Sequence, residues 1–180
     1  GMLLTDEEEA ARKVRFWSTQ ARENVPWYQH KELGYNYRMS NILAGIGRGQ
    51  LRYLEEHRIR KKQIYQRYEQ GLKGFPLTMN PFLEYTEPNF WLSCILIDKG
   101  IEVSPVKIRE KLEEYHVESR PIWKPMHLQP VYENYDFVMA EEGEDVGKDI
   151  FCRGLCLPSD IKMTEQEQEI IMELIKNCFV

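Results

Sequence analysis

The stretch FWLSCILID, residues 90–98, decides the fold of the second half of the chain. It is an almost continuous apolar run that follows a proline-punctuated segment, and such a run predicts a buried strand. Further along, 117–123 reads as a second strand and 124–146 as a long loop. A short helix over 147–155 and an extended piece at 157–159 are expected to follow.

Two helix starts frame these strands. Ser104 and Pro105 are typical of the N-cap and the first position of a helix. Thr164 and Glu167 have the spacing of a capping box and open a terminal helix with an apolar stripe. Helices alternating with strands in this way predict a compact α+β unit over 75–180.

The first half of the chain carries weaker signals. The apolar run 2–4 reads as the end of a strand, which needs partners from elsewhere to form a sheet. Thr5 and Glu8 also have capping-box spacing and predict a helix that runs to about Gln20. One long helix is expected over 40–74, where apolar residues recur at helical spacing.

Composition excludes several classes of function. The 180 residues carry a net charge of −5, and no face concentrates basic residues, so we expect no nucleic-acid binding. No apolar run reaches the roughly 20 residues of a membrane span. We expect no signal peptide, and the cysteines lack metal-site spacing, which favours a reducing cytoplasm and no metal site. Cys152 and Cys156 stand one helical turn apart and are expected to be buried as small apolar residues.

Three stretches, taken together and in order, resemble one family. They are GYNYRMSN at 34–41, SRPIWKPMHLQP at 119–130 and GLCLPS at 154–159. Their order and spacing are similar to those of nucleotide-sugar aminotransferases of the DegT/DnrJ/StrS type. The resemblance covers essentially the whole chain.

The resemblance implies an α/β fold of fold type I, the fold of many aminotransferases that depend on pyridoxal phosphate. The chain would be a C-terminal fragment of it, consisting of a helical tail of the large domain and a small α+β domain. Residues 1–50 would be the tail of the large cofactor-binding domain, 51–74 a bridging helix and 75–180 the small C-terminal domain. The parent protein is expected to be a homodimer with shared active sites.

The resemblance also implies an activity. Family members transfer an amino group, usually from glutamate, through pyridoxal phosphate to a keto sugar on a nucleotide diphosphate. The motif at 36–39, with the loop at 123–127, looks like the branch that aminates C4 of 4-keto-6-deoxy sugars for surface polysaccharides or glycans. In the family the Schiff-base lysine lies before the point where this chain starts. We therefore expect the 180 residues to be inactive alone and not to bind the cofactor.

Two other functions stay open from the sequence. The chain could be a non-catalytic module that binds nucleotide-sugars or dimerises with a relative. It could equally be part of a dehydratase of the same family, in which histidine replaces the lysine, because that position is not in the chain. In each case 1–50 is expected to expose apolar surface and to favour self-association.

Five residues are candidate ligands of cofactor and substrate. By resemblance, Asn36 and Arg38 reach across the dimer to the cofactor phosphate, although a loop amide and a surface guanidinium are the ordinary alternative. Arg120, Trp123 and His127 are candidates for the nucleotide-sugar, since cationic groups suit a diphosphate and a flat ring suits a base or sugar. Packing is the alternative for the tryptophan. No residue of the chain is assigned a catalytic role.

A glycine-rich segment at 45–49 does not read as a phosphate loop. No buried strand leads into it, and no Lys-Ser/Thr pair follows it. Because each helical glycine costs about 1 kcal/mol relative to alanine, close approach of another helix or of the cofactor is the expected reason for it.

Overall fold

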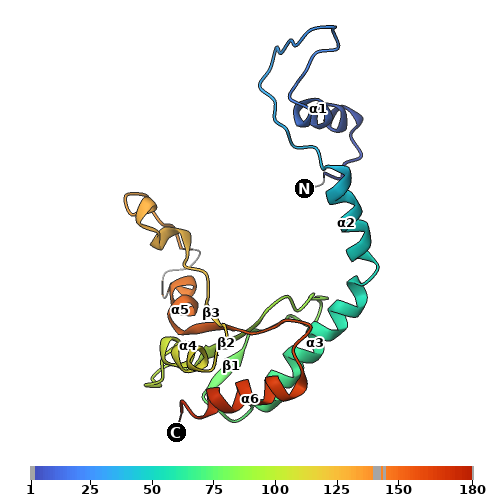
Figure 1. The fold of residues 1–180 in the computed structure, drawn as a ribbon. Helices are drawn as coiled ribbons and strands as arrows, with labels where there is room; N and C mark the ends of the chain where they lie inside the picture. Colours follow the sequence, from blue (N-terminus) through green and yellow to red (C-terminus); the bar gives the residue numbers. More distant parts are fainter. Residues whose placement is uncertain (1–2, 140–142, 144, 180) are drawn as a thin grey trace. The chain divides into compact units, whose positions relative to one another are not determined.

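The computed structural model describes residues 3–139, 143 and 145–179. The chain divides into two compact units, Gly1–Leu54 and Glu55–Val180 (Figure 1). Among the described residues, no helix has the length and apolar character needed to cross a bilayer.

A four-stranded antiparallel sheet forms the centre of the second unit. Its order is β1-β2-β4-β3, and every neighbouring pair is antiparallel. The apolar run 90–98 supplies β2, as predicted. The side chains of β2 alternate between buried and partly buried, so only one face of this strand is fully covered by protein. The strands are β1 Leu77–Met79, β2 Ser93–Ile97, β3 Arg120–Pro121 and β4 Gly154–Leu157.

Three helices cover the sealed face of the sheet. Side chains from α3, α4 and α6 join Ile95, Ile97 and Leu155 of the sheet in one buried cluster. A further helix, α5, leads directly into β4 (Figure 1). The helices are α3 Leu54–Gly71, α4 Pro105–Glu114, α5 Val146–Arg153 and α6 Glu165–Lys176.

Local capping chemistry sets where two of these helices begin. The Ser104 hydroxyl accepts a bond from the Lys107 amide at 3.2 Å, with Pro105 at the first turn. At α6 both halves of the capping box form: Thr164 accepts from the Glu167 amide, and the Glu167 carboxylate accepts from the Thr164 amide. Both predicted helix starts are therefore confirmed.

Two buried polar side chains connect α3 to the rest of the unit. The Gln168 amide donates to the Ile64 carbonyl at 2.8 Å and accepts from Arg67 at 2.8 Å. The Tyr68 hydroxyl, also fully buried, donates to the Pro158 carbonyl at 3.0 Å. Because each buried group has a partner, the cost of removing it from water is offset.

Several sequence predictions for this unit are wrong in detail. The strand expected over 117–123 shrinks to two residues, and the proline-punctuated segment contains the unexpected strand β1. The extended piece expected at 157–159 is displaced into β4, where the chain already pairs with both β2 and β3. The loop 124–146 contains two short 3-10 turns, η1 Met126–Leu128 and η2 Pro130–Tyr132.

The first unit consists of two helices and irregular chain. They are α1 Glu8–Ser18 and α2 Asn41–Leu51, and neither contains a buried residue. The helix expected over 40–74 is interrupted by a turn at 52–53, so α2 and α3 are separate helices. The capping box at Thr5 and Glu8 does not form, because α1 starts later and Thr5 bonds the Glu7 amide instead.

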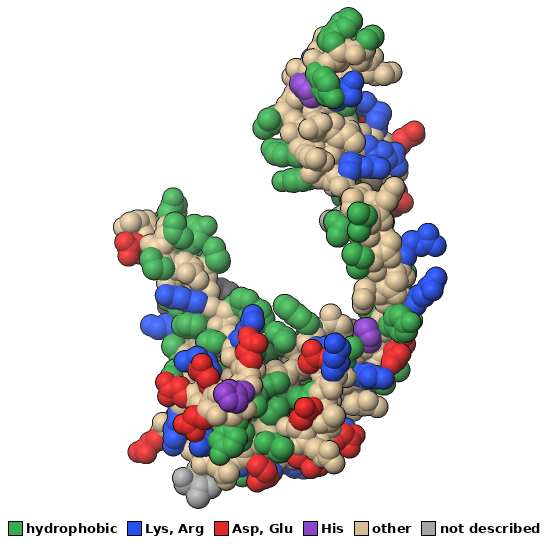
Figure 2. Space-filling model, in the orientation of Figure 1, with side chains coloured by type: hydrophobic (Ala, Val, Ile, Leu, Met, Phe, Trp, Pro, Cys, Tyr) green, Lys and Arg blue, Asp and Glu red, His purple; other side chains and the backbone are tan. Residues whose placement is uncertain are grey.

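Other expectations for the first unit concern its apolar residues. Leu3 and Leu4 pair with no described residue, and because the expected partners of this strand are not in the chain, the strand at 2–4 stays a prediction. Met2 lies outside the described residues. The expected apolar exposure is present (Figure 2): Leu4 is 86% exposed, Ile42 is 77% exposed, and Ala21 is the one buried residue described in 3–54.

A glycine fixes the irregular segment against α1. A side chain at Gly34 would place its Cβ 2.2 Å from the carbonyl carbon of Gln20 and 2.7 Å from the Cβ of Ala21. Gln20 and Ala21 themselves have positive φ angles of 69° and 50°, which form the sharp bend after α1. By contrast, Cβ atoms at Gly45, Gly47 and Gly49 of α2 would meet no described atom, so no close contact within the chain explains them.

Candidate cofactor and substrate sites

The segment that carries Asn36 and Arg38 is held by backbone bonds to α1. The Tyr35 amide donates to the Trp17 carbonyl at 2.7 Å, and the Tyr37 amide donates to the Ser18 carbonyl at 3.0 Å. The rings of Tyr35 and Tyr37 stack with centroids 5.1 Å apart. The backbone of Tyr35 and Tyr37 is therefore bound to the end of α1, which fixes the segment that precedes α2.

Asn36 and Arg38 are both exposed. Neither side chain forms a hydrogen bond or ion pair with another described residue. They are two residues apart, the spacing that puts side chains on one face of an extended chain. A hollow of about 1010 Å³ in this unit is lined by Arg38 with Tyr35 and Tyr37, but not by Asn36.

These two side chains could hold the phosphate group of pyridoxal phosphate, although only Arg38 lines the hollow. An amide and a guanidinium both donate to a phosphate dianion, and the guanidinium does so through two parallel bonds. Two residues after Arg38, Ser40 caps the N-terminus of the eleven-residue α2, where the helix dipole also favours an anion. The side chains of Asn36 and Arg38 are exposed and can donate to a phosphate, and the N-terminus of α2 begins three residues after Arg38.

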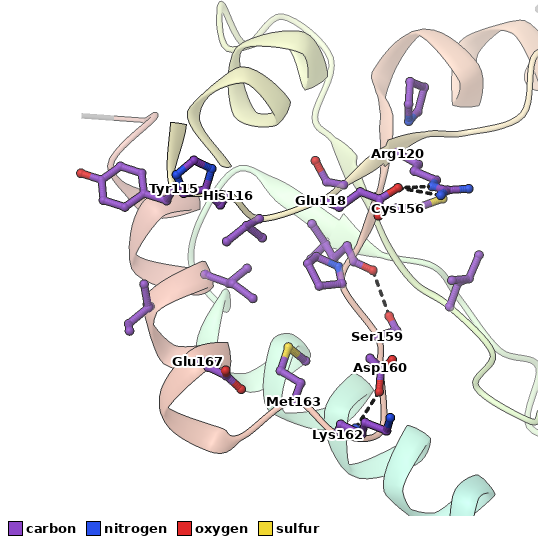
Figure 3. Close-up of a pocket in the computed structure, with 18 of the residues that line it drawn as sticks. Tyr115, His116, Glu118, Arg120, Cys156, Ser159, Asp160, Lys162, Met163 and Glu167 are labelled. Atoms are coloured by element: carbon purple, nitrogen blue, oxygen red, sulfur yellow. Dashed lines mark hydrogen bonds and ion pairs between the residues drawn. The ribbon is translucent and has the colours of Figure 1, made fainter. Parts of the chain in front are cut away.

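In the second unit, Arg120 and Trp123 line one hollow of about 910 Å³. The indole of Trp123 packs at a tilt against that of Trp91, with centroids 5.8 Å apart. Figure 3 shows Arg120 at one side of this hollow beside Cys156, with Met163 and Glu167 across from it. Two of the three predicted substrate residues are thus brought together.

Arg120 is only loosely engaged. Its guanidinium bonds the Glu118 carboxylate at 2.6 and 2.8 Å, but the two side chains are 76% and 74% exposed. Ion pairs this exposed contribute little, about 0–1 kcal/mol, because water competes for both charges. The guanidinium can therefore exchange Glu118 for an incoming anion at small cost.

His127 does not line this hollow. Its Nε2 lies 2.6 Å from an Asp145 carboxylate oxygen, and its ring stacks on Phe137 at 3.7 Å between centroids. The His127 and Asp145 side chains are only 18% and 20% exposed. The pKa of Asp145 is lowered, first by the bond from the Lys148 amide and then by His127. The structure therefore gives this histidine a partner that the sequence did not predict.

Lys61 of α3 is a second residue that sequence reasoning missed. Its ammonium donates to the Trp91 carbonyl at 3.1 Å and also to the Ser159 carbonyl. Burial lowers the pKa of Lys61. The bonds tie together two segments that border the hollow, and no local sequence signal connects residues so far apart.

The model of the "DegT/DnrJ/EryC1/StrS aminotransferase family" matches residues 1–176. The chain belongs to this family. The resemblance identified from the three motifs is confirmed across nearly the whole length.

Curated relatives support the same assignment. EpsN of Bacillus subtilis, whose name is that of a pyridoxal phosphate-dependent aminotransferase, is 41% identical over 99% of this chain and 46% of its own length. GDP-perosamine synthase of Caulobacter vibrioides is 29% identical over 100% of this chain and 48% of its own. The chain thus spans about half the length of these relatives.

Solved structures show the same fold. A DegT DnrJ EryC1 StrS aminotransferase from Brucella abortus superposes with a TM-score of 0.81, covering 98% of this chain and 45% of that one at 22% identity. The Helicobacter pylori aminotransferase PseC gives 0.80, covering 97% and 47% at 18% identity. The predicted fold class, about half of a fold type I sugar aminotransferase, is confirmed.

Proposed function

We propose that this chain is the C-terminal part of an aminotransferase that uses pyridoxal phosphate to aminate a nucleotide-linked 4-keto-6-deoxy sugar, with glutamate as donor. The observation that supports it most is the match of residues 1–176 to the aminotransferase family. Three GDP-perosamine synthases among the relatives, 29%, 32% and 26% identical, favour a sugar of the 4-keto-6-deoxy type. The product would enter a surface polysaccharide or glycan.

In this proposal, residues 1–50 are the tail of the large domain and 51–74 the bridge to the small domain 75–180. The almost complete lack of buried side chains in 3–54 supports it, because a segment with no interior of its own needs other protein to cover it. In a homodimer with shared active sites, that cover would come from the large domains. The division of the chain at Leu54 lies close to the proposed boundary.

Asn36 and Arg38 would hold the cofactor phosphate of the neighbouring subunit. Their side chains are exposed, unengaged by described residues and two apart on a segment fixed to α1. When bound, pyridoxal phosphate supplies the electron sink that transamination needs. The role of this chain's residues is to anchor the phosphate and so keep the ring in one orientation.

Arg120 and Trp123 would bind the nucleotide-sugar. Arg120 offers paired donors to the diphosphate, and the exposed ring of Trp123 offers a flat surface to the base or sugar. His127 would contact the sugar from the neighbouring loop, using the ring nitrogen that does not face Asp145. None of these residues is proposed to form a covalent bond with the substrate.

The test uses the protein encoded by the whole reading frame that contains this sequence. It is incubated with pyridoxal phosphate, glutamate and either the GDP- or the dTDP-linked 4-keto-6-deoxy sugar, and the product is identified by mass spectrometry. A 4-amino sugar formed in proportion to glutamate consumed is the expected result. Loss of a hydroxyl without uptake of nitrogen would assign the dehydratase reaction instead. Binding of the sugar without any turnover would indicate a non-catalytic module.

A further inference from the structure

Two cysteines far apart in the sequence face each other across the sheet. Cys94 of β2 and Cys156 of β4 are direct partners in the antiparallel register. Their sulfur atoms are 3.6 Å apart. The sequence predicted instead that Cys152 and Cys156 are both buried, one helical turn apart. Cys156 is buried in β4, but Cys152 is exposed on α5, so the prediction is wrong for Cys152.

The backbone bonds of Cys94 show which kind of cross-strand pair this is. Its amide donates to the Asn80 side-chain oxygen at 2.8 Å, and its carbonyl accepts from the Asn80 amide at 2.9 Å. Both groups therefore point toward β1 and away from β4. The Cys94–Cys156 pair is then a non-hydrogen-bonded pair, in which Cα atoms are about 4.5 Å apart. That separation lies within the range of about 4.4–6.8 Å that a disulfide requires.

The surroundings make one of the two thiols the better nucleophile. The hydrogen bond from Cys94 lowers the pKa of the Cys156 thiol, and the same bond, with burial, raises that of Cys94. Cys156 also lines the hollow of the second unit, opposite Arg120 in the register of β3 and β4. Cys156 is 5% exposed and Cys94 is partly exposed, but of the two only Cys156 borders this hollow, which makes it the thiol that a reagent held there would contact.

We propose that Cys94 and Cys156 form a reversible dithiol–disulfide site that reacts with small disulfides of the glutathione class. The Cys156 thiolate attacks one sulfur of the reagent, forming a mixed disulfide and releasing one thiolate, which takes up a proton. Cys94 then loses its proton and attacks the Cys156 sulfur, which expels the second thiol. In total the protein loses two electrons and two protons, and the reagent is reduced to two thiols.

This site lies where it can affect the proposed substrate hollow. A disulfide would join β2 and β4 at the strand position that neighbours Arg120 (Figure 3). It would also remove the sulfur of Cys156 as a free group at the hollow. The contact between the two sulfur atoms depends on the register of β2 and β4 and not on the reaction that the parent enzyme catalyses.

The test uses the 180-residue chain with Cys152→Ser, so that the one exposed thiol does not react. The chain is treated with oxidised glutathione, quenched in acid, alkylated under denaturing conditions and mapped without reduction. We expect a linked peptide pair that contains Cys94 and Cys156, a mass loss of about 2 Da, and a fully alkylated Cys178. Dithiothreitol should restore both thiols.

A second variant separates the two steps. Cys94→Ser should stop at the mixed disulfide of glutathione on Cys156. When the Cys152→Ser chain is oxidised in concentrated urea, which unfolds the sheet, the disulfides should also include Cys178. The proposal is overturned if both thiols of the native chain are still alkylated after oxidation, or if the native link involves Cys178. Circular dichroism of the variant establishes that the fold is retained.

Discussion

Removing the hydroxyl of Tyr68 tests whether the second unit is held together as described. This side chain is 0% exposed, and its hydroxyl reaches the Pro158 carbonyl at 3.0 Å. Pro158 stands beside Ser159 and lines the same hollow as Arg120. Tyr68→Phe keeps the ring in the core and deletes the hydroxyl, which bonds the Pro158 carbonyl and lies 3.9 Å from the Met163 sulfur, while the bond from Lys61 of α3 to the Ser159 carbonyl remains.

The magnitude follows from the loss of one partnered buried group. A hydrogen bond between neutral groups contributes about 0.5–1.5 kcal/mol, and leaving its partner unpaired costs about 1–3 kcal/mol. Pro158 is only partly buried, so water can reach its carbonyl in part. We therefore expect the free energy of unfolding to fall by about 1–2 kcal/mol.

Urea unfolding of the chain, followed by circular dichroism and tryptophan fluorescence, measures this change. The control is Tyr85→Phe, because Tyr85 is 84% exposed and should leave the midpoint unchanged. A decrease of 1 kcal/mol corresponds to a melting temperature lower by roughly 4 °C for a unit of this size. If Tyr68→Phe costs no more than Tyr85→Phe, the bond to Pro158 does not stabilise the fold and the account of this region is wrong.

Three further predictions follow from other contacts. Burial raises the pKa of Tyr68 and of Tyr65, so the folded chain holds these protons more tightly. The contribution of these two groups to the free energy of unfolding should be constant below about pH 10 and fall above it. Tyr68→Phe should weaken that fall in urea titrations at pH 9–11. Gly34→Ala should cost about 1–3 kcal/mol through overpacking and speed hydrogen exchange of the amides bonded to α1. In the full-length enzyme, Arg120→Ala should raise KM for the nucleotide-sugar by about 10–100-fold. Arg109→Ala should not, because Arg109 pairs with Glu113 on α4 and does not line the hollow that contains Arg120.

Helix starts were predictable because their chemistry is local. Ser104 with Pro105, and Thr164 with Glu167, lie within one helical turn of the groups they bond. Sequence spacing alone therefore identifies them. The box at Thr5 failed because the same hydroxyl can bond an amide two residues away, which starts no helix.

Features that depend on pairing between distant segments were not predictable. Strand β1 has three residues and β3 has two, too few for a periodic signal, and both exist because β2 and β4 offer them partners. The contact between Cys94 and Cys156 depends on the register of two strands separated by 62 positions.

The candidate site likewise combines residues that are close in the sequence with contacts between distant segments. Arg120 and Trp123 are three residues apart, and their neighbourhood in the hollow follows from the sequence. His127 is separated from them because the chain turns at η1 and meets Asp145, which lies 18 positions further on. Lys61 reaches the border of the hollow from α3, and nothing near it in the sequence indicates that contact.

The near absence of buried side chains in residues 3–54 has a calorimetric consequence. Heat capacity rises on unfolding because apolar groups leave an interior for water, and this stretch has almost no interior to lose. The isolated chain should therefore unfold with the heat-capacity increment of the 126 residues Glu55–Val180, about 1.5–1.9 kcal/mol/K. An ordinary globular protein of 180 residues would give about 2.2–2.7 kcal/mol/K.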